Sequence, residues 1–169
     1  MRQFILTLQF DAETARRLQE LRDAHFPPEL NIVPAHLTLF HQLPGDDERT
    51  VFSAIGRTAT RFAPFPLQIA GPIRLGRGVA LRVEAEALHA LREALATPFE
   101  GRLIAQDRQK FRPHVTIQNK TSAARAEALY RELKETFQPI NGVGEGLQLW
   151  RYERGPWSPV AAIGFSARD

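Results

Sequence analysis

The residues best suited to chemistry are two His-x-Thr triplets, His36-Leu37-Thr38 and His114-Val115-Thr116. Both stand in apolar, β-prone segments, with a proline just upstream and another apolar residue after the threonine. Because side chains alternate along a strand, each histidine shares a face with its threonine, while the residue between them points to the core. Neutral imidazole accepts a proton and imidazolium donates one near neutral pH. Two such motifs facing each other predict acid–base chemistry at one centre.

The threonines indicate which group would react. A threonine hydroxyl can donate a hydrogen bond to a non-bridging phosphate oxygen, whose charge must be stabilised in the transition state. The predicted catalytic residues are therefore His36, Thr38, His114 and Thr116, acting on a phosphodiester or a cyclic phosphate. Which histidine is the acid stays open, because the roles reverse between the forward and reverse reactions.

We expect neither a metal nor a cofactor. The chain has no cysteine, which excludes a thiolate nucleophile, a thiolate metal site and disulfides. A metal held by the two motif histidines would need a third ligand. The sequence has no H-x-x-x-H pattern and no carboxylate pair near either motif that would provide one.

The composition permits an anionic substrate without requiring one. The net charge is +3, and most basic residues are arginines, whose planar fork suits phosphate, although genome composition explains the arginine content equally well. An apolar fraction of 43% is typical of globular proteins. No apolar run of about 18 residues predicts a membrane span, and residues 3–10 are expected to form a strand and not a signal peptide. We expect a cytoplasmic monomer without an obligate protein partner.

A repeated order of elements organises the chain. Each half is expected to run strand, helix, His-x-Thr strand, helix, strand, which favours a duplication, although alternating elements often look self-similar. Amphipathic patterns place Leu18, Phe52, Leu91 and Leu129 on the inner faces of the helices, and two glycine-rich segments, 71–78 and 142–146, are interpreted as turns. The strands are expected at 3–10, 34–43, 64–70, 79–83, 112–120, 144–153 and 159–165.

The paired His-x-Thr-apolar motifs, one per half, resemble those of the 2H phosphoesterase superfamily, which includes 2′-5′ RNA ligase-like proteins and cyclic phosphodiesterases. The resemblance extends over essentially the whole chain. It implies an α+β, bilobal fold in which two antiparallel β-sheets with outer helices are related by a pseudo-twofold axis around a central cleft. Residues 1–169 would form one domain with lobes at about 1–78 and 79–169, and an exchange of terminal strands between them is left open.

The resemblance also implies an activity. Enzymes of this kind act without metal on 2′,3′-cyclic phosphate or 2′-5′ phosphodiester bonds and in some cases ligate RNA in reverse, so His36 and His114 would be the acid–base pair and Thr38 and Thr116 the phosphate donors. The expected substrate is an RNA terminus or a small cyclic nucleotide. The segments after both motifs differ from the usual Phe-Leu-Gly and arginine continuations: they read Phe-His-Gln and Gln-Asn-Lys here.

Further residues are candidates for substrate binding. Lys110, Arg112 and Lys120 are an even number of residues from His114, so an extended chain would place them on its face, although a solvated strand end explains them equally well. Phe40 is a fourth candidate. His41 is an odd number of residues from His36, which predicts the opposite face unless a bulge intervenes. One of the aromatic residues near the C-terminal hairpin, Trp150, Tyr152 and Trp157, could stack on a base, but such residues are more often core.

A second function, from another class, also fits the sequence. The chain could be a non-catalytic module that binds single-stranded RNA or nucleotides and uses the bihistidine cleft as a phosphate pocket. This alternative predicts salt-sensitive binding with no product.

Overall fold

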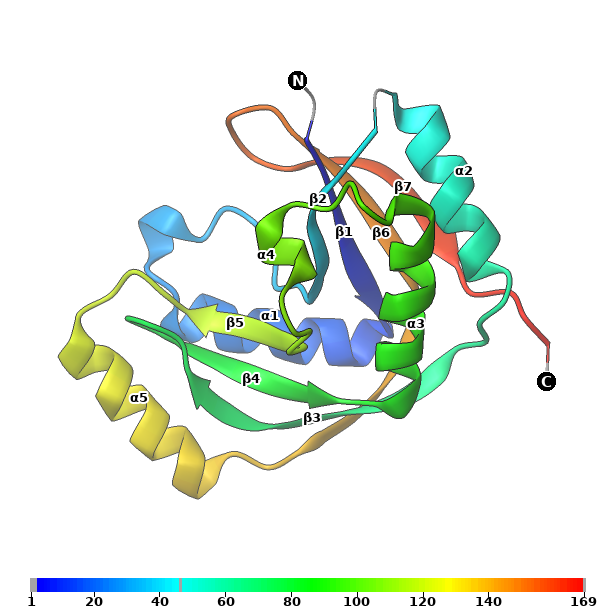
Figure 1. The fold of residues 1–169 in the computed structure, drawn as a ribbon. Helices are drawn as coiled ribbons and strands as arrows, with labels where there is room; N and C mark the ends of the chain where they lie inside the picture. The colour runs from blue at the N-terminus through cyan, green and yellow to red at the C-terminus, as the bar shows by residue number, and fades with distance from the viewer. Residues whose placement is uncertain (1–2, 46, 169) are drawn as a thin grey trace.

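The computed structural model describes residues 3–45 and 47–168 and has an α+β fold (Figure 1). The strands are β1 (Gln3–Phe10), β2 (Thr38–Leu43), β3 (Phe65–Arg74), β4 (Val79–Glu84), β5 (His114–Gln118), β6 (Ile140–Tyr152) and β7 (Ser158–Gly164). The helices are α1 (Ala12–His25), α2 (Glu48–Ala59), α3 (Glu86–Ala96), α4 (Ala105–Arg108) and α5 (Ala123–Thr136), with short 3-10 turns η1 (Pro28–Leu30) and η2 (Thr97–Phe99). In these ranges of the chain, no helix is both long and apolar enough to cross a membrane.

All described strands belong to one antiparallel sheet, where the sequence predicted two. The order is β2-β1-β6-β3-β4-β5, and β7 pairs with β6. The two expected sheets merge because β6 is long: its residues 140–144 pair with β3, while residues 144–152 pair with β1. Beyond the end of β3, strand β7 takes its place beside β6 and pairs with residues 146–151. Figure 1 shows β1 and β2 running at a steep angle to β3, β4 and β5, so the sheet is strongly curled.

The strand order reads the same from both ends if β1, β2 and β3 are exchanged with β4, β5 and β6. The first strand of each half pairs with the third strand of the other half, since β1 lies beside β6 and β4 lies beside β3. Strand β7 has no counterpart in this scheme. We propose from this order that residues 1–78 and 79–169 are two lobes of one domain that exchange their third strands.

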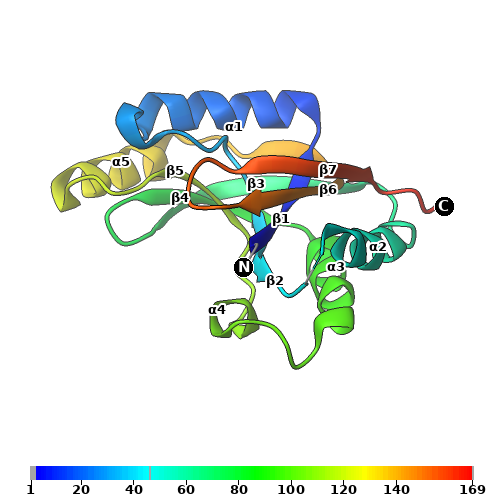
Figure 2. The same cartoon turned by 90° about the horizontal axis from the view of Figure 1, so that it is seen from above.

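The helices cover both sides of the sheet around a single hydrophobic cluster. Figure 2 shows α1 and α5 on one side of the strands and α2, α3 and α4 on the other. The expected inner faces of α1, α3 and α5 are buried at Leu18, Leu91 and Leu129. In α2 the expected Ile55 is buried, but Phe52 is 45% exposed, and Val51 is buried in its place. Side chains cap the helix starts: Asp11 accepts a bond from Thr14 N at 3.2 Å, and Asp47 accepts one from Thr50 N at 2.7 Å.

The glycine-rich segments are mostly strand, contrary to the turn interpretation. Residues 142–146 lie inside β6, and only 75–78 forms a turn, with Gly76 at a φ of +51°. A Cβ atom at Gly142 would lie 2.4 Å from Thr14 Oγ1. The small residue is therefore required by the close approach of α1 to the strand, and not by a turn.

Candidate active site

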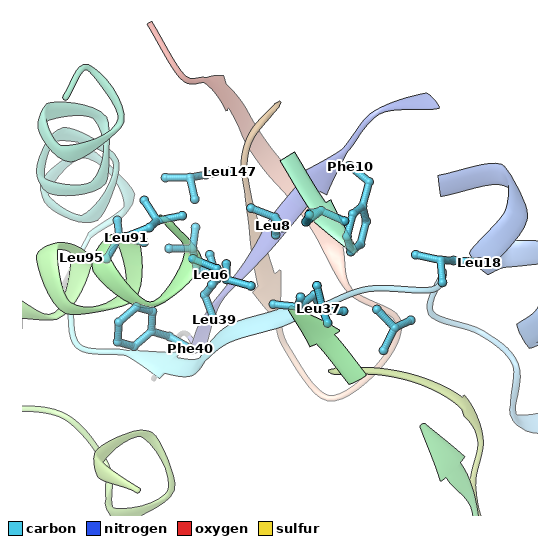
Figure 3. Packing of buried hydrophobic residues seen from close by; sticks show 14 of the residues in the cluster. Leu6, Leu8, Phe10, Leu18, Leu37, Leu39, Phe40, Leu91, Leu95 and Leu147 are labelled. Atoms are coloured by element: carbon cyan, nitrogen blue, oxygen red, sulfur yellow. The ribbon is translucent and has the colours of Figure 1, made fainter. Parts of the chain in front are cut away.

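The two His-x-Thr motifs meet because the ends of the sheet meet. Leu37 and Val115, the central residues of the motifs, form an isolated antiparallel bridge between the segments of β2 and β5, and both are fully buried. Residues on either side of a bridged pair in an antiparallel ladder face each other across the strands. His36 is therefore placed across from Thr116, and Thr38 across from His114. Figure 3 shows Leu37 and Leu39 pointing into the core among Leu6 and Leu8.

All four motif side chains line one cleft of about 680 Å³. The cleft is also lined by residues of β1, of the segment around α4, and of the end of β6 and its connection to β7. This volume falls within the range of sites that enclose nucleotide-sized ligands. The other polar or aromatic side chains that line the cleft are Gln3, His41, Arg92, Gln106, Asp107, Gln109, Lys110, Phe111, Arg112, Asn119, Tyr152 and Trp157.

Both motif imidazoles are held in the same way. His36 Nδ1 lies 2.8 Å from the carbonyl oxygen of Pro34, and His114 Nδ1 lies 2.6 Å from that of Arg112. A carbonyl oxygen only accepts hydrogen bonds, so each Nδ1 carries the proton and donates it. Each Nε2 is then left to accept a proton from, or donate one to, a group in the cleft. The same bond to the residue two positions back gives the two rings matched tautomers.

The environment of His36 favours its neutral form. Burial lowers the pKa of His36 to about 4, and the positive charges of Arg22 and His114 act in the same direction, while the bond to Pro34 opposes them. The ring of Trp157 covers His36, with the two ring centroids 4.7 Å apart. Near neutral pH this imidazole is therefore uncharged and able to accept a proton.

Strand β2 departs from regular alternation, and this corrects the prediction for His41. Thr38 pairs with Thr7, but Phe40 pairs with the adjacent Leu6, so β2 holds one extra residue at this point, and a second register shift follows before Leu43 pairs with Phe4. The bulge buries two consecutive residues, Leu39 and Phe40, and reverses the parity beyond them. His41 therefore lines the cleft and does not point to the opposite face.

The same bulge removes Phe40 from the cleft. Its side chain is fully buried, and the Arg92 guanidinium lies 3.7 Å above its ring while Nε donates to the Leu39 carbonyl at 2.7 Å. Figure 3 shows Phe40 in the core near Leu91 and Leu95 of α3. As a substrate-binding candidate Phe40 is corrected to a packing residue.

A buried carboxylate not anticipated from the sequence holds the bulged strand. Asp107 of α4 accepts bonds from the backbone N–H groups of His41 and Gln42 at 2.8 and 2.9 Å, and from His41 Nδ1 at 3.0 Å. Burial alone would raise the pKa of Asp107, but these three bonds, led by that from the His41 ring, hold it below its ordinary value. Asp107 is ionised near neutral pH. No local sequence pattern marks it, because its partners lie far away in the chain.

Only two of the three basic substrate-binding candidates line the cleft. Lys110 and Arg112 line the cleft, but Lys120 does not, since β5 ends at Gln118 and Lys120 has a left-handed φ of 56°. In the described part of the chain, no three His, Asp or Glu side chains are grouped closely enough to hold a metal ion.

The three aromatic residues near the C-terminal hairpin also differ in whether they line the cleft. Trp157 and Tyr152 line the cleft. Trp150 instead donates from Nε1 to the buried Thr7 Oγ1 at 2.9 Å and packs edge-on against Trp157 at 5.9 Å. Two of the three residues therefore offer an aromatic surface to a ligand, and the third supports them.

The fold and the paired His-x-Thr motifs are those of the 2H phosphoesterase superfamily. The sequence matches the 2′-5′ RNA ligase superfamily over residues 10–156, and the chain belongs to this superfamily. None of the curated proteins matched the sequence significantly.

Solved structures show the same fold at low sequence identity. TT0787 of Thermus thermophilus aligns over 100% of both chains with 22% identity and a TM-score of 0.70. E. coli LigT complexed with 3′-AMP aligns over 98% of both chains with 21% identity and a TM-score of 0.68. LigT has also been crystallised with NADP+ and with ATP. Usb1 of Kluyveromyces marxianus aligns over 96% of this chain and 97% of its own, with 14% identity and a TM-score of 0.50.

Proposed function

We propose that this chain is a metal-independent phosphodiesterase that acts on 2′,3′-cyclic phosphate or 2′-5′ phosphodiester bonds of RNA or nucleotides. The observation that carries the proposal is the Leu37–Val115 bridge, because the two imidazoles and two hydroxyl groups that flank it line the same cleft. Membership of the 2′-5′ RNA ligase superfamily supports the same reaction class.

The two histidines divide the proton transfers. His36, neutral because burial lowers its pKa to about 4, accepts a proton at Nε2 from the attacking water. His114 donates a proton from Nε2 to the ribose oxygen as its bond to phosphorus breaks. The water oxygen ends on the phosphorus, which leaves a phosphate monoester and a free ribose hydroxyl. If a ribose 5′-hydroxyl takes the place of water, the same step on a 2′,3′-cyclic phosphate joins two RNA ends. The reverse of that ligation, attack of the 3′-hydroxyl on the 2′-5′ linkage, exchanges the roles of the two histidines.

The threonines stabilise the charge that develops on the phosphoryl group. Thr38 and Thr116 stand beside the opposite motif's histidine, so one hydroxyl can donate to each non-bridging oxygen while both Nε2 atoms face the bonds that form and break. Trp157 and Tyr152, at the wall of the cleft, can hold the base of a nucleotide by stacking.

Single replacements of the histidines test the proposal. His36→Ala and His114→Ala should each lower kcat on adenosine 2′,3′-cyclic phosphate by about 10²- to 10⁴-fold, with unchanged circular dichroism. His89→Ala is the matched control, because His89 is exposed on α3 outside the cleft. Treatment with EDTA should not change the rate.

Two results would point elsewhere. Full activity in either cleft variant would refute the acid–base pair. Binding of cyclic nucleotides or RNA by the wild-type protein, with no product from a panel of cyclic phosphates and 2′-5′ linked dinucleotides, would favour the alternative of a non-catalytic nucleotide-binding module.

A further inference from the structure

The cleft holds a third imidazole that the proposed reaction does not use. His41 lies on the bulged part of β2, where the register against β1 advances by only about two residues, roughly 7 Å, from Thr38. Its Nδ1 donates to Asp107 Oδ1 at 3.0 Å. With Nδ1 engaged in this way, Nε2 on the other side of the ring is left for a group in the cleft.

Two of the three bonds that hold the strand to Asp107 do not involve the His41 ring. Asp107 already fixes the bulge through the backbone N–H groups of His41 and Gln42, and these bonds do not depend on the side chain at position 41. The carboxylate itself is almost fully buried, with 1% of its side chain exposed, whereas the imidazole is 46% exposed. A side chain oriented by a buried carboxylate and open to the cleft is arranged for ligand binding.

The surrounding charges favour an anion at this place. Lys110 and Arg112 follow Asp107 closely in the chain and line the same cleft, and neither forms an ion pair with a carboxylate of the described residues. Asp107 is the one carboxylate among the described residues that line the cleft, and its oxygens are occupied by His41 and Gln42. Arg92, the remaining cation, donates to the backbone carbonyls of Leu39 and Asp107.

We propose that His41, oriented by Asp107, binds a second phosphate of the substrate, one nucleotide unit away from the scissile phosphate, and that Lys110 of the same cleft contributes its charge. When protonated, the imidazole donates one hydrogen bond to Asp107 and one to the phosphate. The inference rests on the proposed function and narrows its substrate class to nucleotides or RNA ends that carry a 5′-phosphate or a 5′-linked nucleotide. A nucleoside cyclic phosphate alone would leave this subsite unused.

Three substrates with and without a second phosphate distinguish an effect at the proposed second subsite from an effect at the scissile phosphate. These are adenosine 2′,3′-cyclic phosphate, the same compound with a 5′-phosphate, and the adenosine dinucleotide that ends in a 2′,3′-cyclic phosphate. His41→Gln should raise KM about tenfold for the substrates with a second phosphate, which corresponds to one hydrogen bond to a charged group. KM for the first substrate should change less than twofold. The matched control is His89→Gln, which should leave all three KM values unchanged.

Equal changes of KM for all three substrates, or a loss of kcat on all three, would overturn the proposal, because His41 would then act on the scissile group. An effect confined to the dinucleotide would assign the subsite to a phosphodiester, and one confined to the 5′-phosphorylated mononucleotide to a terminal phosphate; either result supports a second phosphate subsite.

Binding measurements test the second phosphate subsite independently of the proposed catalysis. Calorimetry should show that the wild-type protein binds adenosine 3′,5′-bisphosphate more tightly than 3′-AMP, and that His41→Gln removes the difference while its far-UV circular dichroism is unchanged. This result is independent of turnover, so it would stand even if no cyclic phosphate were hydrolysed. Equal affinities of the wild-type protein for the two ligands would refute the subsite and leave the acid–base proposal intact.

Discussion

Arg22 of α1 donates a hydrogen bond from Nη1 to the backbone carbonyl of Thr116 at 3.0 Å, so a helix of the first half holds the motif strand of the second. Arg92 of α3 makes the reciprocal contact, from Nε to the Leu39 carbonyl at 2.7 Å. Arg22 is 5% exposed and stacks at 4.0 Å over Phe26. Each half thus holds the motif strand of the other half with a guanidinium.

Replacing Arg22 with methionine should loosen this arrangement. Methionine fills similar volume but leaves the Thr116 carbonyl and Asn31 Oδ1, which also accepts from Arg22 at 2.9 Å, without a donor. The free energy of unfolding should fall by about 1–3 kcal/mol, and kcat should fall because α1 no longer fixes the Thr116 end of the motif in β5. Urea unfolding checks the first effect and turnover of a cyclic phosphate the second. Arg17→Met, on the exposed face of the same helix, is the control; an equal loss in both variants would contradict the role of Arg22.

The hydroxyl groups of the motifs should matter more for kcat than for KM. Thr38→Val and Thr116→Val remove a donor while keeping the side-chain shape, and each should lower kcat by about 10²-fold, as for the loss of one oxyanion donor. Steady-state kinetics on adenosine 2′,3′-cyclic phosphate measures this. Thr136→Val, at the exposed end of α5, serves as the control. Unchanged kcat in both cleft variants would exclude the threonines from phosphate stabilisation.

The arrangement of the motifs could be predicted because it depends on three consecutive residues. Alternation over His36-Leu37-Thr38 and His114-Val115-Thr116 correctly placed the central residues in the core. The pairing of Leu37 with Val115 is a long-range contact that no local pattern encodes. Only the match between the two halves of the chain indicated that these strands meet.

Predictions that depended on longer regularity failed for physical reasons. Parity counted from His36 to His41 was wrong because pairing with β1 introduces a bulge at Leu39 and Phe40. The two-sheet arrangement was wrong because β6 continues through its glycines from one set of strands to the other. Phe52 was placed inward from spacing alone, but the face of α2 that packs is centred on Val51 and Ile55.

The Trp157 ring should control the protonation of His36. It covers the imidazole at 4.7 Å, and burial is the main reason why the pKa of His36 is lowered. Trp157→Ala would admit water and raise the pKa of His36 toward its ordinary value, which NMR titration of the ring protons would detect. Trp157→Phe, which keeps an aromatic cover, should give a smaller rise. A pKa that stays near 4 in the alanine variant would show that the rest of the cleft, and not the cover of Trp157, keeps His36 neutral.

His36 should also make the stability of the fold depend on pH. Its pKa is about 4 when folded and about 6.5 when unfolded, so between these values the unfolded chain binds a proton at this position and the folded chain does not. Stability rises with pH wherever the unfolded state binds more protons. The contribution of neutral His36 is therefore complete above about pH 6.5 and is lost as the pH falls toward 4.

Urea unfolding of the wild-type protein and of His36→Asn at several pH values measures this contribution. As the pH falls from about 6.5 to 4, the free energy of unfolding of the wild-type protein should decrease more than that of His36→Asn. The effect of Asp107 is the same in both proteins and cancels in the comparison. Parallel curves for the two proteins would show that His36 is protonated as readily in the folded cleft as in water, and the assignment of His36 as the base would lose its support.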